Sequence, residues 1–264
     1  MSAEKTIAIV LRSVEFSESS YISTLFTESA GKITALAKGA RRPKSAFENA
    51  LDLLSISRVV FLRKSSDAMD LLTEAKLERR FRAAARDLTR LYAAYYVIEL
   101  LNALTGERDP NPRLFRISQH TLVSLDGNGD VGLDVLRFEL ALLHSMGQVP
   151  VLDRCIECGQ QLGETRRMAF GQLAGGALCS KCRPGHRHVA SLSQFAVKTM
   201  QQMIKDIDAD AEFVRKDRLL ETTHDLENEA TEKLAPAVRG ELRGLMNHRM
   251  SHLLGRRPRT SLKH

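Results

Sequence analysis

The sequence lacks long apolar runs: none approaches the roughly 18 residues that a helix needs to cross a bilayer. Its first residues, Met-Ser-Ala-Glu-Lys, lack the charged and then apolar segment of a secretory signal peptide. Cysteine is scarce, with four in 264 residues, and a globular chain of this length needs no disulfides to fold. These absences predict a cytoplasmic protein without a membrane partner.

Motifs of the common catalytic sites are also missing. The sequence contains no Gly-x-Ser-x-Gly, no His-Glu-x-x-His and no dinucleotide-binding fingerprint. Residues 26–34 are similar to a phosphate-binding loop, but Phe26 replaces its first glycine and Ile33 replaces the Mg²⁺-binding Ser or Thr. No paired carboxylates at a strand end suit a two-metal nuclease. The sequence therefore predicts no enzyme and no small-molecule substrate.

Charge is unevenly distributed along a chain whose composition, 43% hydrophobic and 27% charged, is ordinary for a soluble protein. The net charge of +7 mildly favours an anionic partner. Residues 208–232 hold nine acids and three bases, which are best interpreted as a solvated helix face. Residues 233–264 hold eight bases and one acid. Arg256, Arg257 and Arg259 fit phosphate contact and a mobile basic tail equally well.

Hydrophobic periodicity divides the chain into a β part and a helical part. Alternation and turn residues predict strands at residues 6–12, 22–27, 32–37, 53–64 and 70–77, which suit a small barrel or sandwich. Helical spacing starts at Phe81 and recurs in residues 114–125, 133–143, 192–207 and 219–254, with Asn111 and Pro112 opening a helix and a break or kink at Pro236.

The predicted fold class is therefore multidomain, with α and β parts. Residues 1–80 form a small β barrel or sandwich. Residues 81–264 form an α-helical domain that carries an inserted four-cysteine zinc module at about residues 150–190.

All four cysteines belong to one pattern. Cys155 and Cys158 are separated by two residues, and so are Cys179 and Cys182. Two such thiolate pairs close a tetrahedron around Zn²⁺ at about 2.3 Å per bond. A redox role is the weaker alternative, and four thiolates leave no open position for catalysis. The spacing predicts one structural zinc ion.

A cluster of cations follows the third expected strand. Lys38, Arg41, Arg42 and Lys44 lie in a turn that also contains Gly39 and Pro43, and they fit phosphate contact or an ordinary basic loop equally well. Its place beside a small barrel favours phosphate contact, because OB folds bind single strands along basic grooves with aromatic residues for stacking. Candidate stacking residues are Tyr21, Phe26 and Phe61, although such residues are more often core.

Several segments together resemble one known family. They are Val10-Leu11, residues 18–27, Gly31-Lys32-Ile33, residues 38–42, Ser45, the cysteine quartet, Leu254-Gly255 and Arg259-Thr260-Ser261. In these segments the chain resembles the bacterial RecO family of DNA repair proteins. The resemblance covers nearly the full length and is most specific in residues 10–45 and in the cysteine module.

The resemblance implies that residues 1–80 form an OB-type β barrel that binds DNA. It implies a cytoplasmic, nucleoid-associated recombination mediator that binds single- and double-stranded DNA and anneals complementary strands. It implies two protein partners: RecR, with which the family helps load RecA, and the acidic, apolar C-terminal tail of single-stranded DNA-binding protein. The expected DNA contacts are Lys32, Lys38, Arg41, Arg42, Lys44, Arg256, Arg257 and Arg259. The expected contacts to the tail are Arg239, Arg243 and Arg249.

Without the resemblance, the residues support a nucleic-acid-binding protein with a basic barrel, a zinc ribbon and helices. A zinc-ribbon adaptor in transcription or RNA metabolism is the alternative function, since such a protein has the same parts.

Overall fold

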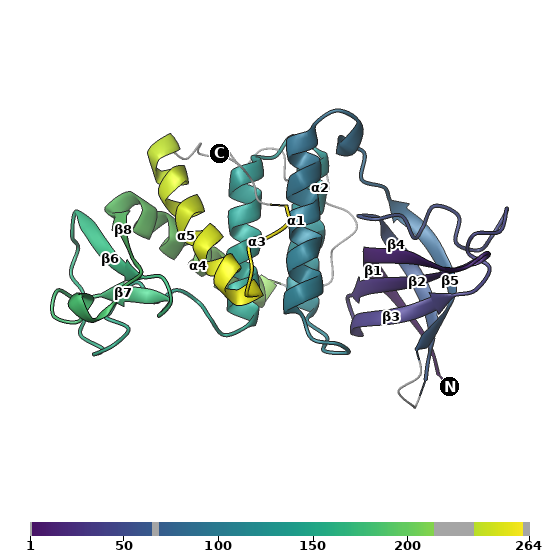
Figure 1. The fold of residues 1–264 in the computed structure, drawn as a ribbon, viewed down its shortest axis with the longest axis horizontal. Helices are drawn as coiled ribbons and strands as arrows, with labels where there is room; N and C mark the ends of the chain where they lie inside the picture. Colours follow the sequence, from purple (N-terminus) through teal and green to yellow (C-terminus); the bar gives the residue numbers. More distant parts are fainter. Residues whose placement is uncertain (1, 65–68, 214–234, 261–264) are drawn as a thin grey trace. The chain divides into compact units, whose positions relative to one another are not determined.

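The computed structural model describes residues 2–64, 69–213 and 235–260, which form two compact units (Figure 1). The first contains residues 2–131 with 258–260, and the second contains Gly132–Arg257. Most of the acidic stretch 208–232 lies outside the described residues, as does the first part of the expected helix 219–254. The domain boundary predicted at residue 80 stays a prediction. It marks the change from strands to helices, whereas the compact units are defined by contacts between residues, which place the first two α-helices with the strands.

Five strands of the first unit form a closed barrel: β1 (Ser2–Ser17), β2 (Ser20–Thr27), β3 (Gly31–Ala37), β4 (Ile56–Arg63) and β5 (Asp70–Arg79). β1 pairs with β2 and β4, and β5 pairs with β4 and, in parallel, with β3. The period-2 alternation of β3 turns Ile33, Ala35 and Ala37 into a core shared with Leu25 and Phe61. The predicted OB-type barrel is confirmed.

Two helices pack on the barrel within the first unit. They are α1 (Leu88–Leu104), capped by the Asp87 side chain, and α2 (Pro112–Asp126), capped by the Asn111 side chain with Pro112 in the first turn. The ring of Phe115 in α2 lies 5.9 Å from that of Phe26 in β2. This contact buries Phe26 completely and fixes α2 against the barrel.

The first helix begins at Leu88 and not at Phe81, where the apolar spacing starts. Residues 83–85 form a short 3₁₀ turn instead (η1). The buried carboxylate of Asp126 accepts hydrogen bonds from the backbone N–H groups of Arg82 and Ala83, at 2.6 and 2.8 Å. These bonds fix the start of the 3₁₀ turn, and the α-helix begins only after Asp87, whose extended backbone and side chain cap α1.

Lys32 joins the barrel to the end of α1. Its Nζ donates hydrogen bonds of 2.8 Å to the carbonyl oxygens of both Asn102 and Thr105, where helical carbonyls have no partner within the helix. Glu107 lies 3.6 Å from the same ammonium group. Lys32 is only 8% exposed. It therefore stabilises the negative end of the helix dipole.

The second unit combines helices with a small sheet. Its helices are α3 (Val131–Ser145), α4 (Gln194–Phe213) and α5 (Pro236–Leu254). Strands β6 (Arg167–Gly171), β7 (Gly176–Leu178) and β8 (Val189–Ser193) pair in the order β7-β6-β8, and η2 (Arg183–Gly185) is a 3₁₀ turn. Pro236 occupies the first turn of α5, so it starts the helix. Within the described residues, no helix has both the length and the apolar character that crossing a membrane requires.

Replacing Lys32 should destabilise the first unit. Lys32→Met removes both ionic hydrogen bonds to the carbonyl oxygens of Asn102 and Thr105, which should lower the free energy of unfolding by about 2–4 kcal/mol. Urea unfolding followed by circular dichroism measures this value. Lys38→Met is the matched control, because Lys38 is exposed and should change stability by less than about 0.5 kcal/mol. Equal stability of the two variants would contradict the role of Lys32 as a helix cap.

Candidate metal centre and nucleic-acid interface

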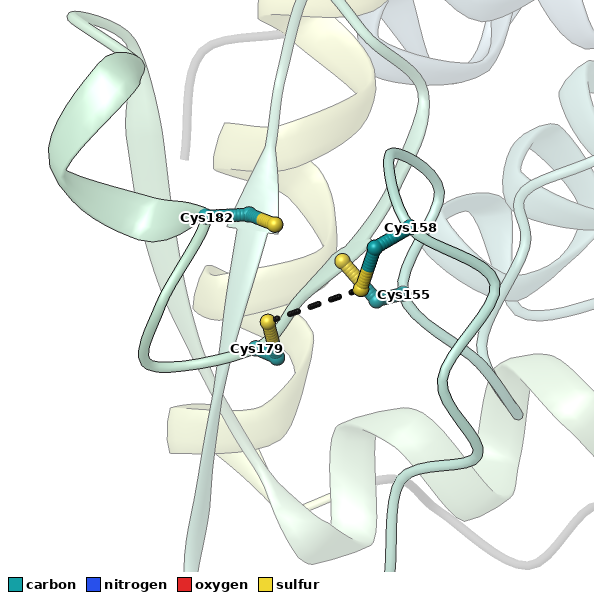
Figure 2. Close-up of side chains that lie close together, drawn as sticks. All are labelled: Cys155, Cys158, Cys179 and Cys182. Atoms are coloured by element: carbon teal, nitrogen blue, oxygen red, sulfur yellow. Dashed lines mark hydrogen bonds between the residues drawn. The ribbon is translucent and has the colours of Figure 1, made fainter.

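Two backbone turns present the four cysteines to one another (Figure 2). In the first turn, the N–H of Gly159 donates to the carbonyl of Cys155 at 2.9 Å, and Gly159 adopts the left-handed conformation that glycine favours. In the second, the N–H of Arg183 donates to the carbonyl of Cys179 at 3.0 Å. A hydrogen bond from Ile156 N–H to Ala177 O ties the first turn to β7.

The sulfur positions fit a tetrahedral metal ion. All four Sγ atoms lie within 4.8 Å of one another, and those of Cys158 and Cys179 are 3.8 Å apart. A tetrahedron with metal–sulfur bonds of about 2.3 Å has edges of about 3.8 Å. The four cysteines are therefore positioned to bind one metal ion, as their spacing in the sequence predicts.

The protonation of the four sulfurs also favours a bound cation. Backbone N–H groups of Cys158 and Cys179 lower the pKa of the Cys155 thiol to about 6. The N–H of Cys182 likewise lowers the pKa of Cys179. In contrast, the sulfurs of Cys179 and Cys158 raise the pKa of Cys182 to about 12. The turns stabilise some thiolates but not four together, so a divalent cation is needed to hold the full set deprotonated.

Apolar packing around the cluster is thin. Among the described residues, its buried members are Cys155, Leu178 and Cys179, with a few partly buried neighbours such as Ile156 and Val189. A module with so little core needs a metal ion or another cross-link to fold. Beside the cluster, Nε2 of His186 lies 3.3 Å from the Glu157 carboxylate.

The basic loop, residues 38–44, is ordered by its own hydrogen bonds at one end of the barrel. The N–H of Arg42 donates to Gly39 O, and the hydroxyl of Ser45 donates to Ala40 O, both at 3.0 Å. The loop contacts the turn between β1 and β2 through a bond from Arg41 N–H to Ser19 O. The predicted contacts Lys38, Arg41, Arg42 and Lys44 are exposed on this loop.

The remaining predicted DNA contacts have different environments. Lys32 is buried against α1, at the opposite end of β3 from the basic loop, and has no surface to offer to DNA. We therefore leave it out of the interface. Arg256 and Arg257 are exposed after α5 in the second unit. Arg259 is exposed in the first unit, where its backbone N–H donates to the Glu99 carboxylate.

Two of the three candidate stacking residues belong to the core. Phe26 and Phe61 are completely buried, as β-strand phenylalanines in a small barrel usually are. The ring of Tyr21 is half-buried and lies 5.9 Å from the Arg41 guanidinium, so it supports the basic loop. Sequence reasoning missed Phe16, which is exposed and whose neighbours Glu15 and Ser17 contact Arg41 of that loop. The sequence feature that could have indicated its exposure is its place among the polar residues of Glu-Phe-Ser-Glu-Ser.

The three arginines expected to bind an acidic tail differ in accessibility. Arg243 is buried in an ion pair with Glu139 and donates to Asn247, so it acts within the core. Arg249 donates to Leu173 O and to Gln148 Oε1, and burial lowers its pKa. Arg239 is half-exposed on the first turns of α5. Arg249 also lines a small apolar hollow of the second unit, together with Leu143, Pro150, Phe170 and Met246.

Comparisons with known proteins cover the whole chain. The family described as "Recombination protein O N terminal" matches residues 1–81, and "Recombination protein O C terminal" matches residues 85–263. A DNA repair protein RecO from Rhodopirellula baltica is 39% identical over 96% of both chains. The chain belongs to the RecO family. A RecO from Myxococcus xanthus is 32% identical over 95% of this chain and 92% of its own length.

Membership in the RecO family places the chain in DNA repair and recombination. It also accounts for the joint presence of an OB-type barrel, a helical part and a four-cysteine cluster, which is the layout that the sequence predicts.

Removing one ligand should release the metal ion from this RecO-family chain. Protein purified without added metal should contain one ion per chain, and Cys179→Ser should contain almost none. Its residues 150–190 should exchange amide hydrogens freely while the barrel remains protected, because the module has little core of its own. Elemental analysis and hydrogen exchange measure both effects. Because protons compete for the thiolates, metal affinity should fall as pH falls.

Two findings would contradict this assignment. One is a folded wild-type module without metal, and the other is a disulfide between any two of the four cysteines. Ser180→Ala is the control for the substitution itself, since Ser180 is exposed between the cysteines of the second pair.

Proposed function

We propose that this protein is a recombination mediator that binds single- and double-stranded DNA and anneals complementary strands. The observation that supports this proposal most directly is the basic loop, whose four exposed cations lie on an ordered turn at the end of an OB-type barrel. Two phosphate backbones repel each other, and a cationic surface that binds both lowers the repulsion and lets bases pair. This activity requires no nucleotide hydrolysis, in keeping with a mediator that is not an enzyme.

The metal ion in this proposal is Zn²⁺ with a structural role. Four cysteine thiolates in a tetrahedron are a typical structural zinc site, and they leave no coordination position for a substrate. Bound zinc would hold the two cysteine turns together and so fix β7 and the neighbouring strands. The same proposal places the protein in the cytoplasm, at the nucleoid.

The proposed partners are RecR, with which the protein would help load RecA, and the C-terminal tail of single-stranded DNA-binding protein. An acidic tail with an apolar end suits the hollow beside Arg249, where a cation borders Leu143, Phe170 and Met246. Arg239 is the second candidate contact. Arg243 is better explained by its buried partner Glu139.

The first functional prediction concerns salt dependence. Changing Lys38, Arg42 and Lys44 to Ala removes up to three phosphate contacts, so the log–log slope of affinity against salt should fall by roughly two units for single strands. Arg41 is retained because it supports the loop. Fluorescence anisotropy titrations measure the slope, and annealing of strands coated with single-stranded DNA-binding protein should slow in parallel.

A second variant tests where the affinity resides. Changing Arg256, Arg257 and Arg259 to Ala removes the other exposed cations that the sequence points to. If this variant loses affinity and slope while the loop variant retains both, the barrel loop is not the DNA site. A purified protein that binds strands but never anneals them would reject the mediator function and favour an adaptor.

The second functional prediction concerns the tail. Arg249→Ala should weaken binding of a labelled tail peptide about 10- to 100-fold, because an ionic hydrogen bond to its carboxylates is lost. Arg239→Glu should weaken it as well. Arg187→Glu, at an exposed position in the same unit, is the control and should bind normally. Unchanged binding by both variants at low salt would show that the tail docks elsewhere.

A further inference from the structure

Phe16 is unusually exposed for a phenylalanine in a strand. It lies near the end of β1, and 62% of its surface is accessible. The pairing of β1 with β2 shifts register here: Glu15 pairs with Tyr21 and Ser17 pairs with Ser20, which leaves Phe16 as the extra residue of a β-bulge. A bulge re-aims a side chain out of the regular alternation. The register thus accounts for a large apolar side chain that is not turned into the core.

The bulge and the basic loop form one hydrogen-bonded surface. Arg41 Nη1 donates to the carbonyl of Ser17 at 3.1 Å and pairs with Glu15 at 3.0 Å, so it contacts the residues on both sides of Phe16. The N–H of Arg41 also donates to Ser19 O in the turn. These three interactions hold Glu15, Ser17 and Ser19, which flank Phe16, against the loop that carries Lys38, Arg42 and Lys44.

No other aromatic residue in the described part of the barrel has a free ring face. Phe26 and Phe61 are completely buried, Phe47 is buried, and Tyr21 lies beneath Arg41. An exposed aromatic ring beside phosphate-binding cations is the combination with which single-strand-binding proteins hold nucleic acid. Charge complementarity favours nucleic acid over an apolar protein partner, because the exposed cations Lys38, Arg42 and Lys44 outnumber the exposed acid of the β1–β2 turn, Glu18, once Glu15 is paired with Arg41.

We propose that Phe16 stacks on a base of single-stranded DNA held by the basic loop, and that it gives this site its preference for single strands over duplex. The inference rests on the proposed function of the loop. In a duplex both faces of each base are covered by neighbouring base pairs, so the ring has nothing to stack on. Phosphate contacts alone do not make this distinction, since both forms of DNA offer phosphates.

The test compares three DNA probes of equal length: an oligo-dT strand, an abasic strand with the same phosphates, and a duplex. Phe16→Ala should weaken binding of oligo-dT about 5- to 100-fold. It should leave the affinity for the abasic strand and the duplex unchanged, together with the salt slope. Phe16→Trp should restore oligo-dT binding, because indole offers a larger stacking face.

Phe195→Ala is the matched control, since Phe195 is the same residue type, is 76% exposed and lies in the other unit. It should bind all three probes normally. The inference is overturned if Phe16→Ala binds oligo-dT normally, or if it loses affinity for all three probes equally. If the loop variant loses its salt slope while Phe16→Ala changes nothing, only this inference fails. If wild-type protein binds no DNA in a salt-dependent manner, the proposed function fails with it.

Discussion

The buried ammonium group of Lys32 is the contact on which the layout of the first unit depends. It links the start of β3 to the last carbonyls of α1, so the helices occupy the end of the barrel at the β2–β3 turn. Gly31 is required beside it, because a Cβ there would lie 2.5 Å from backbone atoms of Asp109. Since β3 runs away from this contact, its other end delivers the basic loop to the part of the barrel that the helices do not cover.

A different constraint acts in the second unit. Three short strands and two cysteine turns bury too little apolar surface to fold unaided, and the paired thiolates would repel one another without a cation. The ion pair of Glu139 and Arg243 is a second example in this unit. Both side chains are buried, and each charge is stabilised by the other. A cation thus balances buried or crowded negative charge at both places.

Sequence patterns predict the features that depend on local spacing. The period of two in β3, the cap Asn111 and the spacing within each cysteine pair each depend on residues only a few positions apart, so their geometry follows from the sequence. The environments of single charged residues do not. Nothing in the sequence next to Lys32 indicates its burial, because its hydrogen-bond partners lie 70 and 73 residues away. The exposure of Phe16 depends on a register shift that no local pattern marks.

The inferred interface also suits annealing in a way that a base-reading site would not. Pairing requires free Watson–Crick edges, and neither phosphate contacts nor stacking on a base face occupies them. A strand held by Lys38, Arg42, Lys44 and Phe16 would therefore still present its bases to a complementary strand. When the duplex forms, its bases stack on each other and the contact with Phe16 is lost, while the phosphate contacts persist. The site would then hold the product less tightly than the substrate, which favours release once pairing is complete.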